Sequence, residues 1–165
     1  MKKYELTAEF IEKWGKKLFR IKALISFGSV EAGELGGYVE KEDNLAQDGD
    51  AWVYGDAWVY GDAWVCDNAR VYGNAEVCGN ADYLLIGRIG SRFSFTTFFK
   101  NKDKGITVSC GCFLGTIAEF RAKVTDTHGN NKHAKMYNLA ADMAELQILG
   151  EEHFDKLNTN KSEPF

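Results

Sequence analysis

The chain has 165 residues, a net charge of −4 and a hydrophobic fraction of 45%. That fraction is enough for a packed core, so the composition does not favour disorder. The negative charge argues against general binding to nucleic acid or to anionic membranes, and leaves open a local basic pocket for a small anionic ligand.

The first segment, residues 1–34, is expected to cap the rest of the fold. Phe10, Ile11 and Trp14 have helical spacing, so the sequence predicts a helix over residues 7–15. The stretch KKLFRIKALISF, residues 16–27, alternates as a strand does. No long apolar stretch opens the chain, so we expect neither a signal peptide nor a membrane-spanning helix. We therefore expect a cytoplasmic protein with reduced cysteines.

A six-residue repeat occupies residues 35–84 and is clearest over 51–82. Each unit carries an Ala and a Val two positions apart, followed by Gly or Asp and then Asp or Asn. A period of six does not fit a helix, but it fits a short extended segment that ends in a turn. Three such segments would make an 18-residue coil with Ala and Val facing inward. We expect about three coils.

Aromatic side chains flank the valines of the repeat and are expected to point outward. Exposed apolar patches of this kind favour contact with another surface, either within the chain or on a sister subunit. A platform on which a ligand stacks is the alternative. The candidate oligomer or partner surface consists of Trp52, Tyr54, Trp58, Tyr60, Trp64 and Tyr72.

Residues 85–150 change character and predict an α+β module. RFSFTTFF and GITVSCGC, joined by a polar turn, predict a β-hairpin. A helix is expected between a Thr116 cap and Gly129, and a second one over residues 131–149. Residues 151–165 are expected to form a partly flexible tail.

The repeat AWVYGDAWVYGDAWVCDNARVYGNAEVCGNAD resembles the hexapeptide-repeat left-handed parallel β-helix family. That resemblance implies a mainly β fold with a short left-handed parallel β-helix, an N-terminal cap, a C-terminal β-hairpin and two α-helices. It also implies assembly as a homotrimer. The opening of the chain and IGSRFSFTTFF…ITVSCGCFLGTIAEFRAKVTDTHG look like small repeat proteins of bacteriophages and prophages, which would place the chain in a bacterial host cytosol.

A turn rich in glycine and arginine is the candidate ligand site. Arginine supplies a bidentate donor for phosphate or carboxylate, glycine lets backbone N–H groups approach, and hydroxyls add donors. The alternative is a basic surface turn that pairs with nearby acids. The candidate ligand-binding residues are Arg88, Ser91, Arg92, Thr96, Thr97 and His128.

We expect neither a metal nor a cofactor. Cys110 and Cys112 have one residue between them, which is not the usual zinc spacing, and they are more simply explained as buried, inert thiols. Cys66 and Cys78 are not expected to pair with each other. His128 can interact with a helix dipole without any further role.

Three functions remain open on this evidence. The first is a non-catalytic homo-oligomeric protein that binds a small anionic ligand, possibly a host nucleotide signal sequestered as a phage counter-defence. The second is a scaffold that binds a protein through its aromatic faces. The third is a transferase or hydrolase that uses His128 or His133 as a base. An acyltransferase of the hexapeptide-repeat type is disfavoured because residues 35–84 contain no histidine to act as a general base.

Overall fold

A long antiparallel hairpin forms one end of the molecule. In the computed structural model, which describes residues 1–159, β1 (Tyr4–Lys13) pairs with β2 (Lys16–Ala23). The turn between them has positive φ at both Trp14 and Gly15, as a two-residue hairpin turn requires. The helix predicted over residues 7–15 is therefore wrong, because this turn folds the segment back against β2.

The repeat forms five short strands that pair in parallel. They are β3 (Leu35–Val39), β4 (Trp52–Val53), β5 (Trp58–Val59), β6 (Arg70–Val71) and β7 (Glu76–Val77). β3 pairs with β5 and β5 with β7, while β4 pairs with β6. The inward-facing residues of the repeat are fully or almost fully buried: Val39, Ala51, Val53, Ala57, Val59, Ala63, Val65, Ala69, Val71, Ala75 and Val77.

The prediction of a mainly β protein built on a left-handed parallel β-helix is wrong. Residues 1–159 form separate sheets of five, four and two strands, most strand pairs are antiparallel, and three helices follow. The repeat strands are only two residues long from β4 onward, and the segment at Val65 makes a single bridge with Leu45. The first repeat segment, β3, is paired on one side with the antiparallel hairpin. The parallel pairs are thus one part of a mixed α/β fold.

A four-stranded antiparallel sheet follows the repeat. It has the order β11-β10-β9-β8 and contains β8 (Tyr83–Ile89), β9 (Ser94–Lys100), β10 (Ile106–Cys110) and β11 (Phe113–Thr116). β9 and β10 confirm the predicted hairpin and lie in the middle of this larger sheet. Successive side chains of β9 face opposite sides, so Phe98 packs in the core under the helices and Phe99 packs in the core of the repeat.

Two helices cover the outer face of this sheet. α1 (Ile117–His128) begins at the Thr116 cap and ends before Gly129, as predicted. α2 (Lys132–Ala144) continues into a π-helical turn (Glu145–Leu149), so the second predicted helix is also present. α3 (Glu151–Thr159) occupies the first part of the predicted tail, and the rest of that tail lies outside the described residues. Single 3-10 turns occupy Glu42–Asn44 and Asn80–Asp82.

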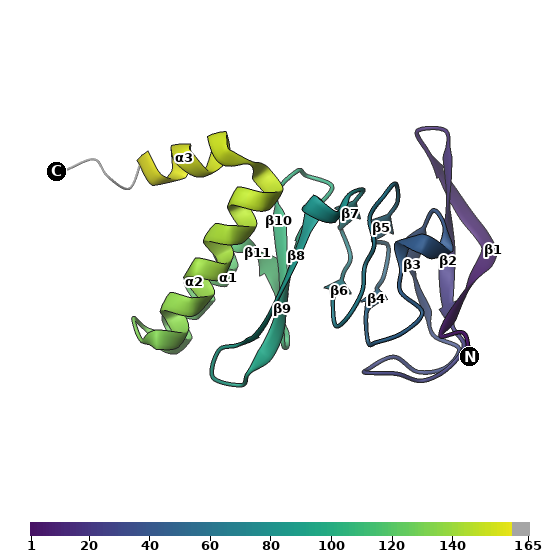
Figure 1. Ribbon diagram of the computed structural model, residues 1–165, viewed down its shortest axis with the longest axis horizontal. Helices are drawn as coiled ribbons and strands as arrows, with labels where there is room; N and C mark the ends of the chain where they lie inside the picture. Colours follow the sequence, from purple (N-terminus) through teal and green to yellow (C-terminus); the bar gives the residue numbers. More distant parts are fainter. Residues whose placement is uncertain (160–165) are drawn as a thin grey trace.

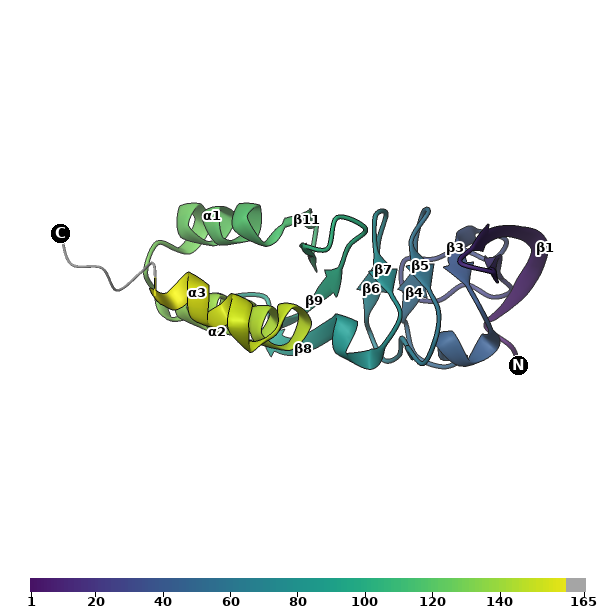
Figure 2. The same ribbon diagram turned by 90° about the horizontal axis from the view of Figure 1, so that it is seen from above.

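The elements follow one another along the long axis of the molecule. Figures 1 and 2 both show the hairpin at one end, the repeat in the middle, and the four-stranded sheet with its helices at the other end. Within residues 1–159, none of the helices combines the length and the apolar character needed to cross a membrane. The two hydrophobic cores meet at the four-stranded sheet, which belongs to both.

Candidate functional site

A cleft of about 410 Å³ opens between the ends of the four-stranded sheet and the two helices. Cavities of this size accommodate small-molecule ligands. Its walls are the turn after β8, the turn between β10 and β11, the second half of α1 and one residue of α2. The lining residues are Ser91, Arg92, Ser94, Cys110, Gly111, Cys112, Phe113, Phe120, Lys123, Val124, Thr127, His128 and Tyr137.

Aromatic rings form the floor of this cleft. Phe120 of α1 lies with its ring centroid 5.7 Å from the rings of Phe98, Phe113 and Tyr137. Edge-to-face and tilted contacts of this kind are favourable for aromatic pairs. The floor is therefore set by side chains that pack against one another, and it offers an apolar surface to a ligand.

The turn after β8 approaches α2 very closely. A Cβ at Gly90 would overlap the hydroxyl group of Tyr137, and the φ of Gly90 is +79°. Both features require glycine at this position. This close approach brings Ser91 and Arg92 to the edge of the cleft.

The charged groups of the cleft are basic. Arg92, Lys123 and His128 line it, and no described residue that lines it is acidic. The His128 ring lies against Tyr137, with centroids 5.8 Å apart. Burial, followed by the proximity of Cys110, raises the pKa of Tyr137 to about 12, so its hydroxyl is a neutral donor at physiological pH. The cleft of this acidic chain is thus locally cationic.

The structure brings only half of the predicted ligand-binding residues together. Ser91, Arg92 and His128 line the cleft. Arg88 is exposed, and its guanidinium lies 5.8 Å from the ring of Phe95, outside the cleft. Arg88 belongs to β8, whereas Arg92 lies in the turn after it, so the two arginines are presented by different parts of the hairpin.

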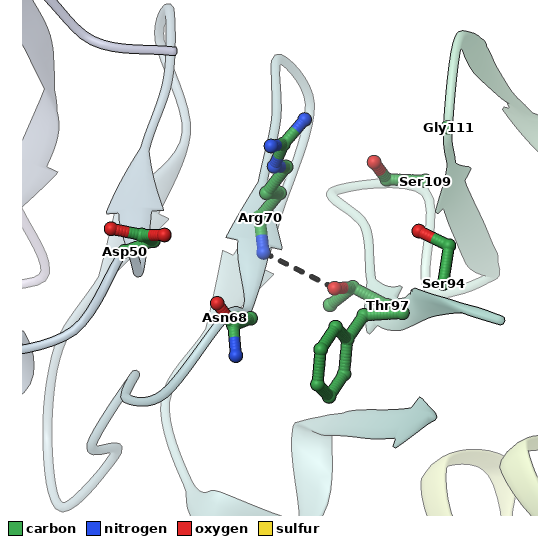
Figure 3. A pocket seen from close by; sticks show the side chains of 8 residues that line it. Asp50, Asn68, Arg70, Ser94, Thr97, Ser109 and Gly111 are labelled. Carbon is green, nitrogen blue, oxygen red and sulfur yellow. Dashed lines mark hydrogen bonds between the residues drawn. The ribbon is translucent and has the colours of Figure 1, made fainter. Parts of the chain in front are cut away.

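Thr96 and Thr97 face opposite sides of the sheet because they are neighbours on β9. The hydroxyl of Thr96 donates to the sulfur of Cys110 at 3.2 Å. The hydroxyl of Thr97 accepts from the backbone N–H of Arg70 at 3.1 Å, as Figure 3 shows. A site containing both hydroxyls, as the sequence predicted, is not formed.

A second, smaller cavity lies on the side of the sheet that faces the repeat. It holds about 100 Å³ and is shown in Figure 3, where the side chains of Arg70 and Asp50 come from the repeat and those of Ser94 and Ser109 from the sheet. Space of this size admits a few water molecules. It is too small for the ligand classes considered above.

The six residues of the predicted aromatic surface differ in how deeply their side chains are buried. Trp52 is completely buried against Tyr4 and Phe27, so it packs within the chain and is not part of an exposed partner surface. Its neighbours in the hairpin and the following loop cover that side of the repeat. Trp64 is 52% exposed. The remaining members, Tyr54, Trp58, Tyr60 and Tyr72, are half-buried.

Tyr54 and Tyr72 stack on each other with centroids 4.2 Å apart. Trp58 and Tyr60 instead contact Trp14 at the tip of the N-terminal hairpin, at 5.8 and 5.4 Å. The ammonium group of Lys102 lies 3.8 Å from the Trp58 ring. Packing within the chain thus accounts for part of the predicted surface.

The cysteines are all free thiols. Cys110 is half-buried, whereas Cys112 is exposed, so the prediction that both are buried is wrong for Cys112. The reason is that β10 ends at Cys110, and Cys112 lies in the turn beyond it. Residues 1–159 contain no group of three or more potential metal ligands, a finding limited to that range.

Sequence reasoning missed Lys123 and Tyr137 as members of the site. Both lie on the predicted helices. Lys123 and Thr127 are four residues apart on α1 and both line the cleft, so their spacing along one side of the helix was the available signal. Nothing in the local sequence around Tyr137 indicates that Gly90 meets it.

Comparison with protein-family models finds no family that matches this chain, and comparison with curated proteins finds no similar one.

Proposed function

We propose that the protein binds a small organic anion without catalysing its conversion, and that the cleft between the four-stranded sheet and α1 is the binding site. The observation that carries this proposal is the composition of the cleft. Arg92, Lys123 and His128 surround an aromatic floor, and no described acidic side chain lines the space.

The basic and aromatic side chains of the cleft suit a ligand that has an anionic group at one end and a flat ring at the other. The guanidinium of Arg92 can hold a phosphate or carboxylate through two parallel hydrogen bonds, and Lys123 adds a second positive charge. A flat ring can pack on the partly exposed ring of Phe113, which Phe120 supports from below, since aromatic surfaces stack on nucleobases. A mononucleotide combines both parts, so it is the first ligand to test. The more specific proposal, that the ligand is a host nucleotide signal, is based only on the resemblance to bacteriophage proteins.

Isothermal titration calorimetry with linear and cyclic nucleotides tests this function. We expect binding to the wild-type chain, and a loss of about tenfold or more in affinity for Arg92→Ala, since a charge-assisted bidentate contact is worth at least 1.4 kcal/mol. Arg88→Ala is the matched control because Arg88 is also an exposed arginine but lies outside the cleft. Absence of heat with every nucleotide, or equal losses in the two variants, would contradict the proposal.

A second candidate function is supported by the aromatic cluster at the hairpin tip. Trp14 is 63% exposed although it occupies a position with positive φ, and it lies against Trp58 and Tyr60. A tryptophan with positive φ is uncommon, and much of this side chain is open to a partner. It favours a protein-interaction surface, either for another protein or for the expected homotrimer. Sedimentation of wild type and Trp14→Ala tests self-association, and a partner whose binding is lost in Trp14→Ala but kept in Arg92→Ala would support a scaffold.

A further inference from the structure

The four cysteines fall into two classes by their surroundings. Cys66 donates its thiol to the carboxylate of Asp67 at 3.3 Å, and Cys78 donates to Asp82 at 3.1 Å. Burial, together with these carboxylates, raises the pKa of both thiols. Negative neighbours therefore keep these two sulfurs protonated and unreactive.

The other two cysteines line the cleft. The sulfur of Cys110 accepts a hydrogen bond from Thr96 and is half-buried at the end of β10. Cys112 is exposed in the following turn, and within residues 1–159 no hydrogen bond to its thiol is found. The same cleft contains Arg92 and Lys123 and no described carboxylate. Cys112 is thus an accessible thiol in a space that attracts anions.

We propose that Cys112 is a modification site at which small anionic disulfides form mixed disulfides with the protein. The proposal deepens the proposed function, because it relies on the same attraction of anions to the cleft. Reactive cysteines in proteins occupy partly exposed, electropositive surroundings of this type.

The chemical step is thiol–disulfide exchange. The Cys112 thiol loses its proton to solvent, and the resulting thiolate attacks one sulfur of the disulfide. The new bond joins that sulfur to Sγ of Cys112, while the old sulfur–sulfur bond breaks and the second half leaves as a thiolate, which takes up a proton. Cys112 is oxidised and the leaving sulfur is reduced, so the disulfide supplies the oxidising equivalent. Arg92 and Lys123 concentrate the anionic disulfide beside the thiol.

The test compares two disulfides on the full chain, namely oxidised glutathione, which is anionic, and bis(2-hydroxyethyl) disulfide, which is neutral. Peptide mapping by mass spectrometry gives the rate at each cysteine. We expect Cys112 to react with oxidised glutathione about tenfold faster than Cys78, which is also exposed but faces a carboxylate. For the neutral disulfide the ratio should be smaller.

Substitutions show which residues cause the preference of Cys112 for the anionic disulfide. Arg92→Gln combined with Lys123→Gln should remove most of the preference of Cys112 for the anionic disulfide, whereas Arg88→Gln should leave it unchanged. Equal reactivity of Cys112 and Cys78, or an anionic preference that survives the double substitution, would overturn the proposal. Circular dichroism of each variant shows whether it is folded, and the wild-type comparison of Cys112 with Cys78 needs no variant at all.

The outcome is separable from that of the proposed function. Nucleotide titrations of the unmodified chain measure ligand binding, and peptide mapping measures thiol exchange. A cleft that binds no nucleotide but directs the anionic disulfide to Cys112 supports this inference and contradicts the nucleotide. A cleft that binds a nucleotide while Cys112 stays inert contradicts this inference alone.

Discussion

Arg121 joins the two helices that form a wall of the cleft, and its removal should destabilise the protein strongly. Its guanidinium donates to Asp142 at 2.7 Å, to Glu145 at 2.8 Å and to the side chain of Asn138 at 3.0 Å. The side chain of Glu145 is only 10% exposed, whereas those of Arg121 and Asp142 are 24% and 35% exposed. Removing one partner of a fully buried ion pair costs about 3–5 kcal/mol.

Partial exposure of the pair lowers the expected cost. We therefore expect Arg121→Met to reduce the free energy of unfolding by about 2–3 kcal/mol, because the carboxylate of Glu145 stays buried without its cation. For a chain of this length that corresponds to a fall in Tm of about 5–10 °C. Urea unfolding and a thermal melt followed by circular dichroism measure both quantities.

The double variant Arg121→Met with Glu145→Met is the decisive control. It removes the buried carboxylate together with its partner, so it should recover at least half of the loss. A single Arg121→Met change that costs less than about 0.5 kcal/mol, which is the range of ordinary surface substitutions, would refute the reasoning. So would a double variant that is less stable than the single one, since the cost would then lie in packing and not in the unpaired charge.

Three further outcomes are expected. Val59→Ala should lower the free energy of unfolding by about 2 kcal/mol because Val59 is fully buried, whereas Trp64→Ala, at a position 52% exposed, should change it by less than half as much in the same urea titration. Gly90→Ala should weaken nucleotide binding more than it weakens folding, because the new methyl group displaces Tyr137 from the wall of the cleft; calorimetry beside a thermal melt separates the two effects. Glu40→Gln should destabilise the protein at pH 7. Hydrogen bonds from a backbone N–H and a lysine lower the pKa of Glu40, so its contribution is present above its ordinary pKa and the difference between wild type and variant should disappear as pH falls through the lowered value.

Local sequence signals were sufficient for the first helix of the C-terminal part. Thr116 caps α1 and accepts from the backbone N–H of Glu119, whose carboxylate accepts from the N–H of Thr116 in return. Gly129 ends the helix. Such signals act within one turn of helix, so they can be recognised without knowledge of the rest of the fold.

The N-terminal helix was mispredicted because two periodicities compete over a short stretch. Phe10, Ile11 and Trp14 fit a helical stripe, yet β1 is held by its pairing with β2, which the spacing within residues 7–15 does not reveal. The turn at Trp14 and Gly15 reverses the direction of the chain, so that β2 can pair with β1. A tryptophan with positive φ is not an expected hairpin residue, so Trp14 does not indicate a turn at this position.

The repeat shows how a local pattern can be right about side chains and wrong about the fold class. The burial of Val59 and its register with Val77 follow from the spacing of the repeat. The fold class also depends on what pairs with the outer repeat segments, and here the hairpin β1–β2 adds antiparallel strands beside Val39. A six-residue period contains no information about such a partner.

The candidate site was half predicted for the same physical reason. Arg92 and Ser91 belong to a turn whose composition predicts an anion site. The cleft itself exists only where that turn meets α1 and α2. The meeting point is Gly90 against Tyr137, 47 positions later in the chain, and it can only be recognised once both are placed in space. The cationic character of the cleft follows from this contact, because it brings the guanidinium of Arg92 to the same space as Lys123 of α1. A cleft assembled in this way should therefore lose its preference for anions whenever the turn is displaced, even if every basic residue is retained.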